Sequence, residues 1–473
     1  MVQKYPYYLG GEAVHGEEEL EVEDKFHRRP FAAVSRAREA AFEKAIQLAL
    51  GAKSELAKIS SYQKRRILEQ VRAGIEERRE DLVRLLVQEV GKPLRDSRSE
   101  VDRLLDTFRI GAEEVSRLGG EVLPLDSVQR GEGYIGFWKR FPRGVCAFIT
   151  PFNFPLNLAA HKIVPALVAG CPFILKPAPT TPVSSLVLGE ILSKAGLPKG
   201  GFSILPAYPE DARLLIEDDR ISLLSFTGSQ IGWKLKEKAG RKRVLLELGG
   251  NAAVVVDETV EDLEGCANRL VRGIFYQSGQ VCISVQRVLI HKKIYGELRD
   301  KLVEKTAKLK VGDPSLEETD LGPMISFKEA ERVHNWIKEA VRCGGKLLIG
   351  GERNGAFLEP TLLENVREDL PLWCEEAFGP VASLQAFEDF SEALAKINAS
   401  QYGLQAGVFT QNLNRAFQAW EELDVGGVMI NEVPAFRVDP MPYGGTKRSG
   451  LGREGIRWAV EEMTEIRLLV MRK

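Results

Sequence analysis

Three residues of types that carry out covalent catalysis stand at the ends of apolar segments. Cys282 closes the glycine-containing turn FYQSGQVC, Glu247 ends the apolar segment VLLEL, and Asn153 lies between two prolines in PFNFP. A thiolate is a nucleophile, a buried carboxylate is a general base, and a rigid amide can stabilise an oxyanion. Each also has a structural interpretation, namely a core thiol, an ion pair and an Asx turn. Together they favour nucleophilic catalysis.

The segments that carry these residues alternate between strand and helix patterns. Between 144 and 250 the apolar segments GVCAFIT, PFILKP, FSILPA, LLSFTGS and RVLLELGG are separated by helical segments. Such alternation predicts a parallel, doubly wound sheet, which binds nucleotides at the carboxyl ends of its strands. A second alternation from about 251 to 435 predicts a second α/β domain with its own sheet.

The remaining segments have different patterns. Residues 31 to 118 show apolar residues at helical spacing, whereas 120 to 143 alternate and contain aromatic residues, which predicts a hairpin ribbon. Residues 436 to 452 are rich in glycine and proline, and the final segment EEMTEIRLLVMRK alternates like an edge strand. We expect this last strand and the ribbon to be able to pair across a subunit interface.

Two GxGxxG matches are poor candidates for a phosphate-binding turn. GEGYIG (131 to 136) and GLGREG (450 to 455) do not join a strand to a helix in a βαβ unit, which the dinucleotide fingerprint requires. Better candidates follow predicted strands. Ser229 in FTGS precedes a helix whose N-terminus can bind phosphate, and Lys176 stands at another strand end.

Composition narrows the classes of partner and compartment. The 473 residues include 65 basic and 67 acidic side chains, for a net charge of −2, so no basic field for nucleic acid is expected. The polar, acidic N-terminus indicates no signal peptide, and the longest apolar stretch, 154 to 175, is interrupted by charge and proline, so we expect no membrane span. The scattered cysteines have no zinc spacing and fit a reducing, cytoplasmic compartment, so no metal site is predicted.

Seven motifs occur in the order typical of one enzyme superfamily. PFNFP, KPAPTTP, FTGS, ELGG, GQVC, EEAFGP and MPYGGTKRSGLGREG follow one another along nearly the whole chain. The chain is therefore identified as a member of the aldehyde dehydrogenase superfamily. VQRVLIH and NEVPAFRVDPMPYGG resemble the branch that contains lactaldehyde and non-phosphorylating glyceraldehyde-3-phosphate dehydrogenases.

The resemblance implies an α/β fold with three parts. The expected Rossmann-type nucleotide-binding domain comprises 1–118 and 141–246, and the second α/β domain, which is catalytic, comprises 247–435. Residues 119–140 and 436–473 would form a β-ribbon arm for oligomerisation. Members of the superfamily are usually dimers or tetramers, so we expect a homodimer or homotetramer.

The resemblance also implies roles for the three residues singled out above. Cys282 would attack the aldehyde carbon, while the Asn153 amide and the Cys282 backbone N–H hold the oxyanion. Hydride transfer to NAD or NADP would leave a thioester, which water activated by Glu247 would hydrolyse to the acid. The expected partner is thus a small-molecule aldehyde. The residues expected at the cofactor are Ile149, Thr150, Phe152, Lys176, Ser229, Gly249, Glu376 and Phe378.

Four departures from the superfamily pattern bear on specificity. The FTGSQIG segment is one residue shorter than the usual pattern, which is expected to shift the helix that begins near Gln230 and the seat of the pyrophosphate. Pro179 replaces the glutamate of many NAD-preferring relatives, so NADP is expected to be tolerated. Val281 and Phe154 replace an arginine and a tyrosine of the phosphate-accepting members, which argues against a phosphorylated triose.

The substrate expected from the sequence is a short aldehyde such as lactaldehyde. Arg109 and His161 are candidates for facing the substrate and favouring a polar or anionic aldehyde, although surface or core packing explains both equally well. A non-phosphorylating glyceraldehyde-3-phosphate dehydrogenase and a semialdehyde dehydrogenase remain alternatives.

Three other classes are less consistent with the sequence. CoA-acylating members generally lack the glutamate of ELGG, whereas Glu247 is present. A non-enzymatic protein of the same fold would be supported by loss of Cys282, Glu247 or Asn153, and none is lost. An unrelated dehydrogenase acting on a hydroxyl would need a glycine-rich turn in a βαβ unit, where neither GxGxxG match lies.

Overall fold

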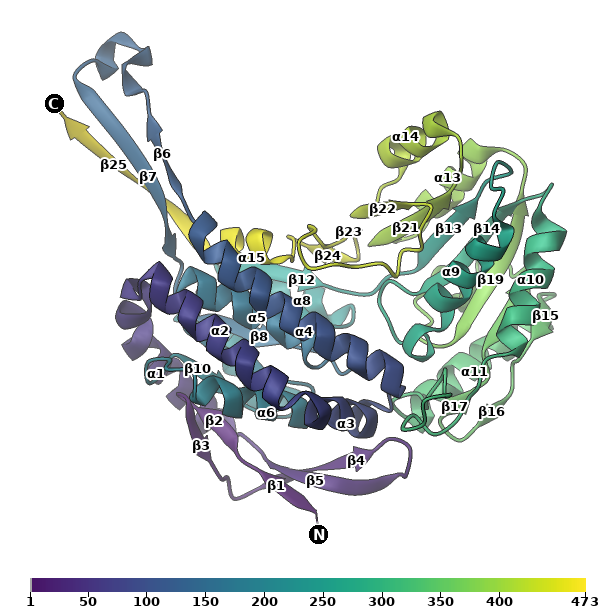
Figure 1. Ribbon diagram of the computed structural model, residues 1–473, viewed down its shortest axis with the longest axis horizontal. Coiled ribbons are helices and arrows are strands. Elements are labelled where there is room, and N and C mark those ends of the chain that lie inside the picture. Colours follow the sequence, from purple (N-terminus) through teal and green to yellow (C-terminus); the bar gives the residue numbers. More distant parts are fainter. Residues whose placement is uncertain (1) are drawn as a thin grey trace.

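A computed structural model describes residues 2–473 and contains two large sheets and a projecting ribbon (Figure 1). One sheet has eight strands in the order β24-β12-β11-β8-β9-β10-β2-β3. Its strands are β2 (Tyr7–Leu9), β3 (Glu12–Val14), β8 (Cys146–Ile149), β9 (Phe173–Lys176), β10 (Phe202–Ile204), β11 (Leu223–Thr227), β12 (Arg243–Glu247) and β24 (Gly450–Leu451).

The five central strands of this sheet are parallel, as the alternating pattern predicted. From β8 the chain adds β9 and β10 on one side, and then β11 and β12 on the other. The carboxyl ends of β8 and β11 therefore lie at a topological switch point, where doubly wound sheets have their binding crevice. Asn153 follows β8 and Ser229 follows β11.

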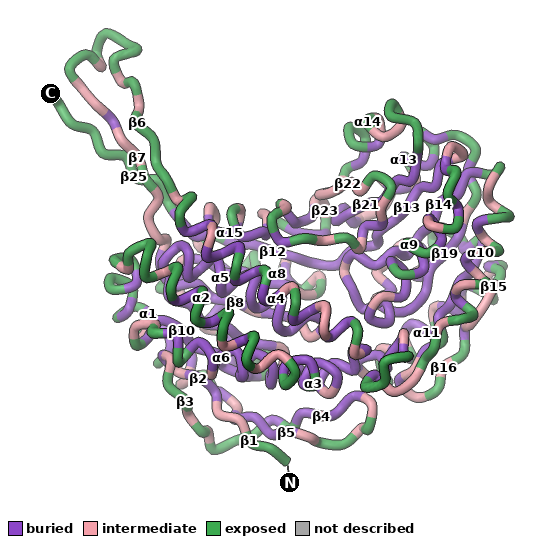
Figure 2. The backbone as a smooth tube through the Cα atoms, in the orientation of Figure 1, coloured by how far each residue is buried: buried purple, intermediate pink, exposed green. Residues whose placement is uncertain are grey.

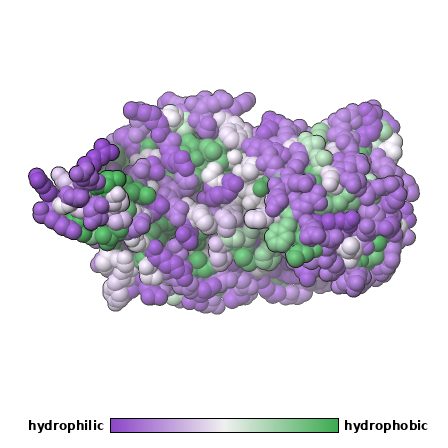
Figure 3. Space-filling view, turned by 90° about the horizontal axis from the view of Figure 1, so that it is seen from above, coloured by the Kyte–Doolittle hydropathy of each residue, from purple (hydrophilic) through white to green (hydrophobic). Residues whose placement is uncertain are grey.

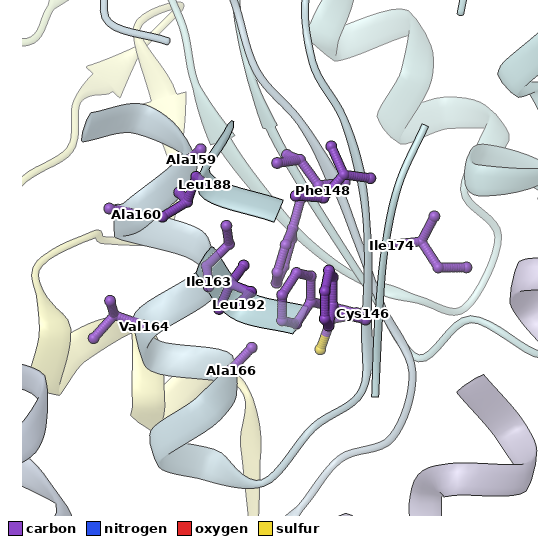
Figure 4. Close-up of a cluster of buried hydrophobic side chains, with 14 of the residues drawn as sticks. Cys146, Phe148, Ala159, Ala160, Ile163, Val164, Ala166, Ile174, Leu188 and Leu192 are labelled. Carbon is purple, nitrogen blue, oxygen red and sulfur yellow. The ribbon is translucent and has the colours of Figure 1, made fainter. Parts of the chain in front are cut away.

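Helices cover both faces of the eight-stranded sheet. They are α1 (Glu39–Lys58), α2 (Ser61–Glu77), α3 (Arg79–Val90), α4 (Leu94–Glu114), α5 (Asn157–Ala169), α6 (Val183–Ser193), α7 (Arg213–Glu217), α8 (Ile231–Lys238) and α15 (Ile456–Glu462). Every residue of α5 is buried. Its apolar side chains pack near those of β8 and β9 (Figure 4), while α4 lies against it. Apolar residues on all faces of a helix require such cover on every side.

The second sheet has seven strands in the order β15-β18-β19-β14-β13-β21-β22, and β15 alone is antiparallel. Its strands are β13 (Ala252–Val256), β14 (Val285–His291), β15 (Lys346–Ile349), β18 (Thr361–Glu364), β19 (Val381–Phe387), β21 (Gln405–Phe409) and β22 (Gly427–Ile430). The accompanying helices are α9 (Leu263–Phe275), α10 (Tyr295–Ala307), α11 (Phe327–Arg342), α12 (Pro371–Cys374), α13 (Phe390–Asn398) and α14 (Leu413–Glu422).

The ribbon consists of β6 (Gly120–Leu123), β7 (Tyr134–Pro142) and β25 (Thr464–Arg472), with β7 in the centre. It projects from the body and is largely exposed (Figures 1 and 2). Seen from above, hydrophobic side chains gather on this projecting end (Figure 3). On β25 the exposed apolar residues are Ile466, Leu468, Leu469, Val470 and Met471. An apolar strand with an unpaired edge is suited to pairing with another chain.

Two segments are distributed differently from the expected division of the chain. Within 436–473 only β25 runs along the ribbon, whereas β24 pairs with β12 and α15 packs against α4 and α5. The N-terminal segment forms a further sheet of β1 (Gln3–Tyr5), β5 (Arg29–Ser35) and β4 (Glu19–Asp24). Buried and exposed residues alternate in β4, as its polar and apolar residues do. This alternation is the sequence feature from which the strand could have been predicted. Of the helices in residues 2–473, none has the length and apolar character needed to cross a membrane.

Candidate active site

Cys282 follows a turn with unusual backbone geometry. Gln277 and Ser278 have φ of 48° and 54°, in the left-handed region. A Cβ on the next residue, Gly279, would lie 2.0 Å from the Gly379 carbonyl oxygen, so this position requires glycine. The turn thus ends α9 and places the cysteine between α9 and β14, beside the loop that contains Gly379.

The thiol of Cys282 lies among apolar side chains and one hydroxyl. Its Sγ is 3.0 Å from the Tyr443 hydroxyl oxygen. Burial raises the pKa of Cys282 to about 11, and the hydrogen bond with Tyr443 opposes that rise. Phe154 and Val281, which replace the polar residues of phosphate-accepting relatives, belong to the apolar cluster around the cysteine.

Asn153 lies beside the nucleophile. It is buried, and its Nδ2 donates a hydrogen bond to the Gln280 carbonyl oxygen at 2.9 Å, two residues before Cys282. The Asn153 backbone oxygen in turn accepts a hydrogen bond from the Gln277 side chain. The loop after β8 and the turn before Cys282 are therefore joined, which holds the amide in place.

Glu247 is the last residue of β12 and is buried. Within residues 2–473 its Oε2 has no hydrogen-bond partner. Burial, together with the nearby carboxylate of Glu454, raises the pKa of Glu247 well above its ordinary value. Burial would raise the pKa of Glu454 too, but Lys162, His161 and Arg437 outweigh it and hold that pKa well below the usual range. Of these two neighbouring carboxyls, Glu454 therefore loses its proton more readily than Glu247.

One cavity of about 370 Å³ brings the three residues together. Its lining comes from the loops after β8, β11 and β12 and from the second domain. The lining residues are Pro151, Phe152, Asn153, Leu158, Thr227, Gly228, Ser229, Glu247, Leu248, Gly249, Cys282, Glu329, Arg332, Glu376 and Phe378. It therefore contains five residues expected at the cofactor. We call it the dinucleotide cleft.

The other residues expected at the cofactor follow the edge of the same sheet. Ile149 and Lys176 are paired in register at the ends of β8 and β9, and the Thr150 amide donates to the Lys176 carbonyl oxygen. The Lys176 ammonium donates to the Pro177 carbonyl oxygen at 3.2 Å, and burial lowers its pKa to about 8. Phe152 and Phe378 meet edge to face, with ring centroids 5.9 Å apart.

Two observations fit a dinucleotide at this edge. The hydroxyls of Thr150 and Thr227, at the ends of β8 and β11, are buried and lack a hydrogen-bond partner among the described residues. Glu376 accepts a hydrogen bond from the Gly250 amide at 2.9 Å, and a Cβ on Gly249 would lie 2.3 Å from Glu376 Oε2. Burial raises the pKa of Glu376 to about 7. Buried polar groups of this kind are normally satisfied, so they indicate a ligand.

The shortened FTGSQIG segment leaves the helix start intact. Gln230 precedes α8, which begins at Ile231, and the Gly228 amide donates to the Glu247 carbonyl oxygen. The two GxGxxG segments lie elsewhere, with 131–136 in the ribbon and 450–455 running through the antiparallel strand β24.

The two candidate substrate residues occupy other positions. Arg109 is exposed on α4 and pairs with Asp106 and Glu113, so the expectation that it faces the substrate is wrong. Arg103, six residues earlier on α4, is partly buried and pairs with Asp439, whereas Arg109 points to solvent because residues six apart lie on different sides of a helix. His161 is buried, and it does not line the dinucleotide cleft.

A second cavity, of about 280 Å³, escaped sequence reasoning. Its lining residues are Ser99, Arg103, Arg269, Arg272, Gly273, Tyr276, Glu432, Val433, Ala435, Phe436 and Arg437. We call it the arginine cavity, because four arginines face a single glutamate. The Nε of Arg103 is buried without a hydrogen-bond partner in the described part of the chain. These arginines are scattered along α4, α9 and the loop after β22, so no local motif marked them.

His161 and Arg437 connect the arginine cavity with Cys282. The Arg437 guanidinium donates to His161 Nδ1 at 2.9 Å and to Glu454 Oε2 at 3.1 Å. It also covers the ring of Tyr443, 3.5 Å from the centroid, and the Tyr443 hydroxyl contacts Cys282. The cavity is thus one aromatic side chain away from the nucleophile.

Comparison with known proteins places this architecture in a family. The family model described as "Aldehyde dehydrogenase family" matches residues 13–469. A 3-sulfolactaldehyde dehydrogenase of Priestia aryabhattai is 43% identical over 99% of this chain and 98% of its own length. The chain belongs to the aldehyde dehydrogenase family, and it is an NAD(P)-dependent aldehyde oxidoreductase.

Two solved structures are similar along the whole chain. Aldehyde dehydrogenase 21 from Physcomitrella patens, in complex with the reaction product succinate, is 47% identical with a TM-score of 0.99, covering 100% of this chain and 99% of that one. The glyceraldehyde-3-phosphate dehydrogenase GapN from Methanocaldococcus jannaschii, complexed with NADP, is 35% identical with a TM-score of 0.91, covering 97% of this chain and 100% of that one. The expected fold and cofactor class are confirmed.

Proposed function

We propose that this enzyme oxidises a short aldehyde with an anionic tail, a carboxylate or a sulfonate, to the corresponding acid. The observation that carries the proposal is the arginine cavity, which is lined by four arginines and one glutamate and is linked to Cys282 through Arg437 and Tyr443. Guanidinium groups bind planar or tetrahedral anions through charge-assisted hydrogen bonds. The named chemistry of the Priestia and Physcomitrella relatives, a sulfonated aldehyde and succinate, supports this substrate class.

In the proposed first step, Cys282 loses its proton and its thiolate attacks the aldehyde carbon. The resulting oxyanion accepts hydrogen bonds from Asn153 Nδ2 and the Cys282 amide. Asn153 Nδ2 already donates one hydrogen to the Gln280 carbonyl oxygen, so its second hydrogen is the one that bonds the oxyanion. The anionic tail extends into the arginine cavity, which fixes the distance between tail and carbonyl carbon.

NAD or NADP held in the dinucleotide cleft would supply the hydride acceptor, and loss of hydride from the adduct would leave an acyl thioester on Cys282. Glu247 then takes a proton from water, whose oxygen attacks the thioester carbon and displaces the Cys282 sulfur as the acid forms. A raised pKa suits Glu247 to this role, because it makes the ionised carboxylate a stronger base toward water. Its unpartnered Oε2 is available to that water.

The residues along the sheet edge are proposed to hold the dinucleotide. Glu376 and Lys176 would bind ribose hydroxyls, Ser229 a phosphate, and Phe378 with Phe152 would border the nicotinamide. Ile149 and Thr150 would line its path, and Gly249 leaves the space that Glu376 needs.

We also propose the division of the chain and its assembly. Residues 1–118 and 141–246 serve as the nucleotide-binding domain, and 247–435 as the catalytic domain. The ribbon, with its exposed apolar strand β25, is the arm through which a homodimer or homotetramer forms. The remainder of the 436–473 segment supports the active site, since it carries Arg437, Tyr443 and Glu454.

Turnover of matched pairs of aldehydes tests the substrate class. We would compare 3-sulfolactaldehyde with lactaldehyde and succinate semialdehyde with butanal, each with NAD and with NADP, by absorbance of the reduced cofactor. Lactaldehyde, the substrate expected from the sequence, is the uncharged member of its pair. The anionic member should have a kcat/KM about tenfold or more above its uncharged partner. Equal values within both pairs would refute the anionic preference and leave the aldehyde dehydrogenase class intact.

A further inference from the structure

The described contacts of Cys282 include one polar side chain that has no part in the mechanism above. Tyr443 is almost wholly buried, and its hydroxyl oxygen is 3.0 Å from Cys282 Sγ. Glu247 has no hydrogen bond to that sulfur within residues 2–473. We propose that Tyr443 is a catalytic residue, whose hydroxyl donates a hydrogen bond to the Cys282 thiolate and stabilises it for attack on the aldehyde.

The tyrosine is held firmly in this position. Its backbone amide donates to the Glu454 carbonyl oxygen at 3.0 Å, and the Glu454 amide donates in return to the Tyr443 carbonyl oxygen. The Glu454 carboxylate binds Lys162 at 3.0 Å and Arg437 at 3.1 Å. A residue anchored in this way keeps its hydroxyl aimed at the sulfur without an ordering cost during the reaction.

Arg437 makes Tyr443 a better donor. Its guanidinium carbon is 3.5 Å from the centroid of the tyrosine ring, and the positive charge draws electron density from the phenol. His161 supports this stacking, because its Nδ1 accepts from Arg437 while its Nε2 pairs with Asp439 at 2.7 Å. A chain of contacts therefore leads to Cys282, and it runs through Asp439, His161, Arg437 and Tyr443.

The charged groups around the sulfur act in opposite directions. Burial raises the pKa of Cys282, and the carboxylates of Glu376 and Glu247 raise it further. The Tyr443 hydrogen bond and the positive charge of Arg437 lower it. Burial also raises the pKa of Tyr443 well above 10, so the phenol keeps its proton and acts as the donor. When the thiolate forms, the thiol proton leaves to water in the dinucleotide cleft.

The test is the pH dependence of Cys282 alkylation in Tyr443→Phe. Iodoacetamide is uncharged, and mass spectrometry of the Cys282 peptide separates its reaction from that of the other cysteines. Loss of a hydrogen bond to a charged sulfur should move the midpoint upward by about one pH unit, and lower the rate below the midpoint about tenfold. Tyr295→Phe is the matched control, because it removes a tyrosine hydroxyl that binds Glu364 away from the site.

Superimposable profiles of Tyr443→Phe and the unmodified enzyme would overturn the proposal. Arg437→Gln, which removes the positive charge, is a second variant, to be measured if Tyr443→Phe does not give a native circular dichroism spectrum. This variant should shift the midpoint in the same direction, and an unchanged midpoint would also contradict the proposal. In steady state, Tyr443→Phe should lower kcat while the KM for NAD or NADP stays unchanged.

The inference rests on the proposed role of Cys282 as nucleophile but not on the substrate class. Alkylation uses neither aldehyde nor cofactor, so a shifted profile stands even if the anionic preference fails. Conversely, the anionic preference can hold while the two profiles coincide, which would refute the role of Tyr443 alone.

Discussion

The dinucleotide cleft and the arginine cavity are linked through Tyr443 and Cys282 but have opposite electrostatic character. Buried carboxyls with raised pKa values, Glu247 and Glu376, line the cleft. Arginines dominate the cavity, and Asp439, which pairs with Arg103, has its pKa held low by His161, Arg103 and Arg437 against the effect of burial. Burial alone raises the pKa of a carboxyl, so the placement of the cations decides which carboxyls become bases.

This difference separates two tasks that one site must perform. A general base requires a carboxyl that exchanges protons near neutral pH, whereas anion binding requires permanent positive charge. Glu454 lies at the boundary, since it neutralises Lys162 and Arg437 and at the same time raises the pKa of Glu247. The chain thereby places a base and a cationic anchor close together without a direct ion pair between them.

The largest expected effect comes from removing the nucleophile, on which the proposed roles of both regions depend. Cys282→Ala should lower aldehyde oxidation by roughly four orders of magnitude, because no thioester can form. Absorbance of the reduced cofactor measures this loss. Cys343→Ala, which changes a partly exposed cysteine outside the site, should retain full activity. Full activity of Cys282→Ala would disprove the covalent mechanism.

Next in size is a change confined to the dinucleotide cleft. Glu247→Gln should retain the initial burst of reduced cofactor and slow the steady-state rate about hundredfold, because only hydrolysis needs the base. The steady-state rate of the unmodified enzyme should rise with pH as Glu247 loses its proton, and the variant should lack that rise. Stopped-flow absorbance separates the two phases, with exposed Glu237→Gln as the control. Loss of the burst would mean that Glu247 acts before hydride transfer.

A change confined to the arginine cavity should alter specificity instead. Arg272, whose guanidinium lies over Tyr276, lines the cavity. Arg272→Gln should raise the KM for succinate semialdehyde about tenfold and leave that for butanal unchanged, because one charge-assisted hydrogen bond is lost. Arg299→Gln, on α10, is the matched control. Equal effects on both aldehydes would show that Arg272 acts through packing.

The smallest expected effect concerns the choice of cofactor. The family resemblance predicts that Pro179 lies beside the 2′-position of the cofactor, where a carboxylate would repel the phosphate of NADP. Pro179→Glu should therefore shift the ratio of kcat/KM values toward NAD by about tenfold or less. Initial rates with each cofactor at one saturating aldehyde concentration measure the ratio. Pro198→Glu introduces the same charge on another loop and should leave it unchanged. A ratio unchanged in Pro179→Glu would place the ribose elsewhere.

Much of the cleft could be predicted because its residues follow strands in short, ordered segments. Glu247 ends the parallel strand β12, and Asn153 and Ser229 lie in the loops that follow β8 and β11. Parallel strands bring their carboxyl ends to one edge. Local pattern was therefore sufficient to assemble these residues. Local sequence pattern could not predict the arginine cavity. Arg103, Arg272 and Arg437 lie far apart in sequence, and each resembles an ordinary surface arginine of a helix or loop.

The contrast between Arg109 and Arg103 shows why local pattern is insufficient there. Both lie on α4, and only the packing of that helix against α5 and α15 decides which arginine turns inward. The role of Tyr443 could not be predicted from the sequence either, because it depends on the contact of the hydroxyl with Cys282, which only the folded chain creates.

The sequence by itself determined the strands and helices, the parallel sheet and the residues at its carboxyl edge, because hydrophobic periodicity and turn residues act over short distances. Only the tertiary structure decided which charged groups meet. The strength of an electrostatic interaction depends on distance and burial, and both are set when α4, α9 and the loops bearing Arg437 and Tyr443 pack around Cys282.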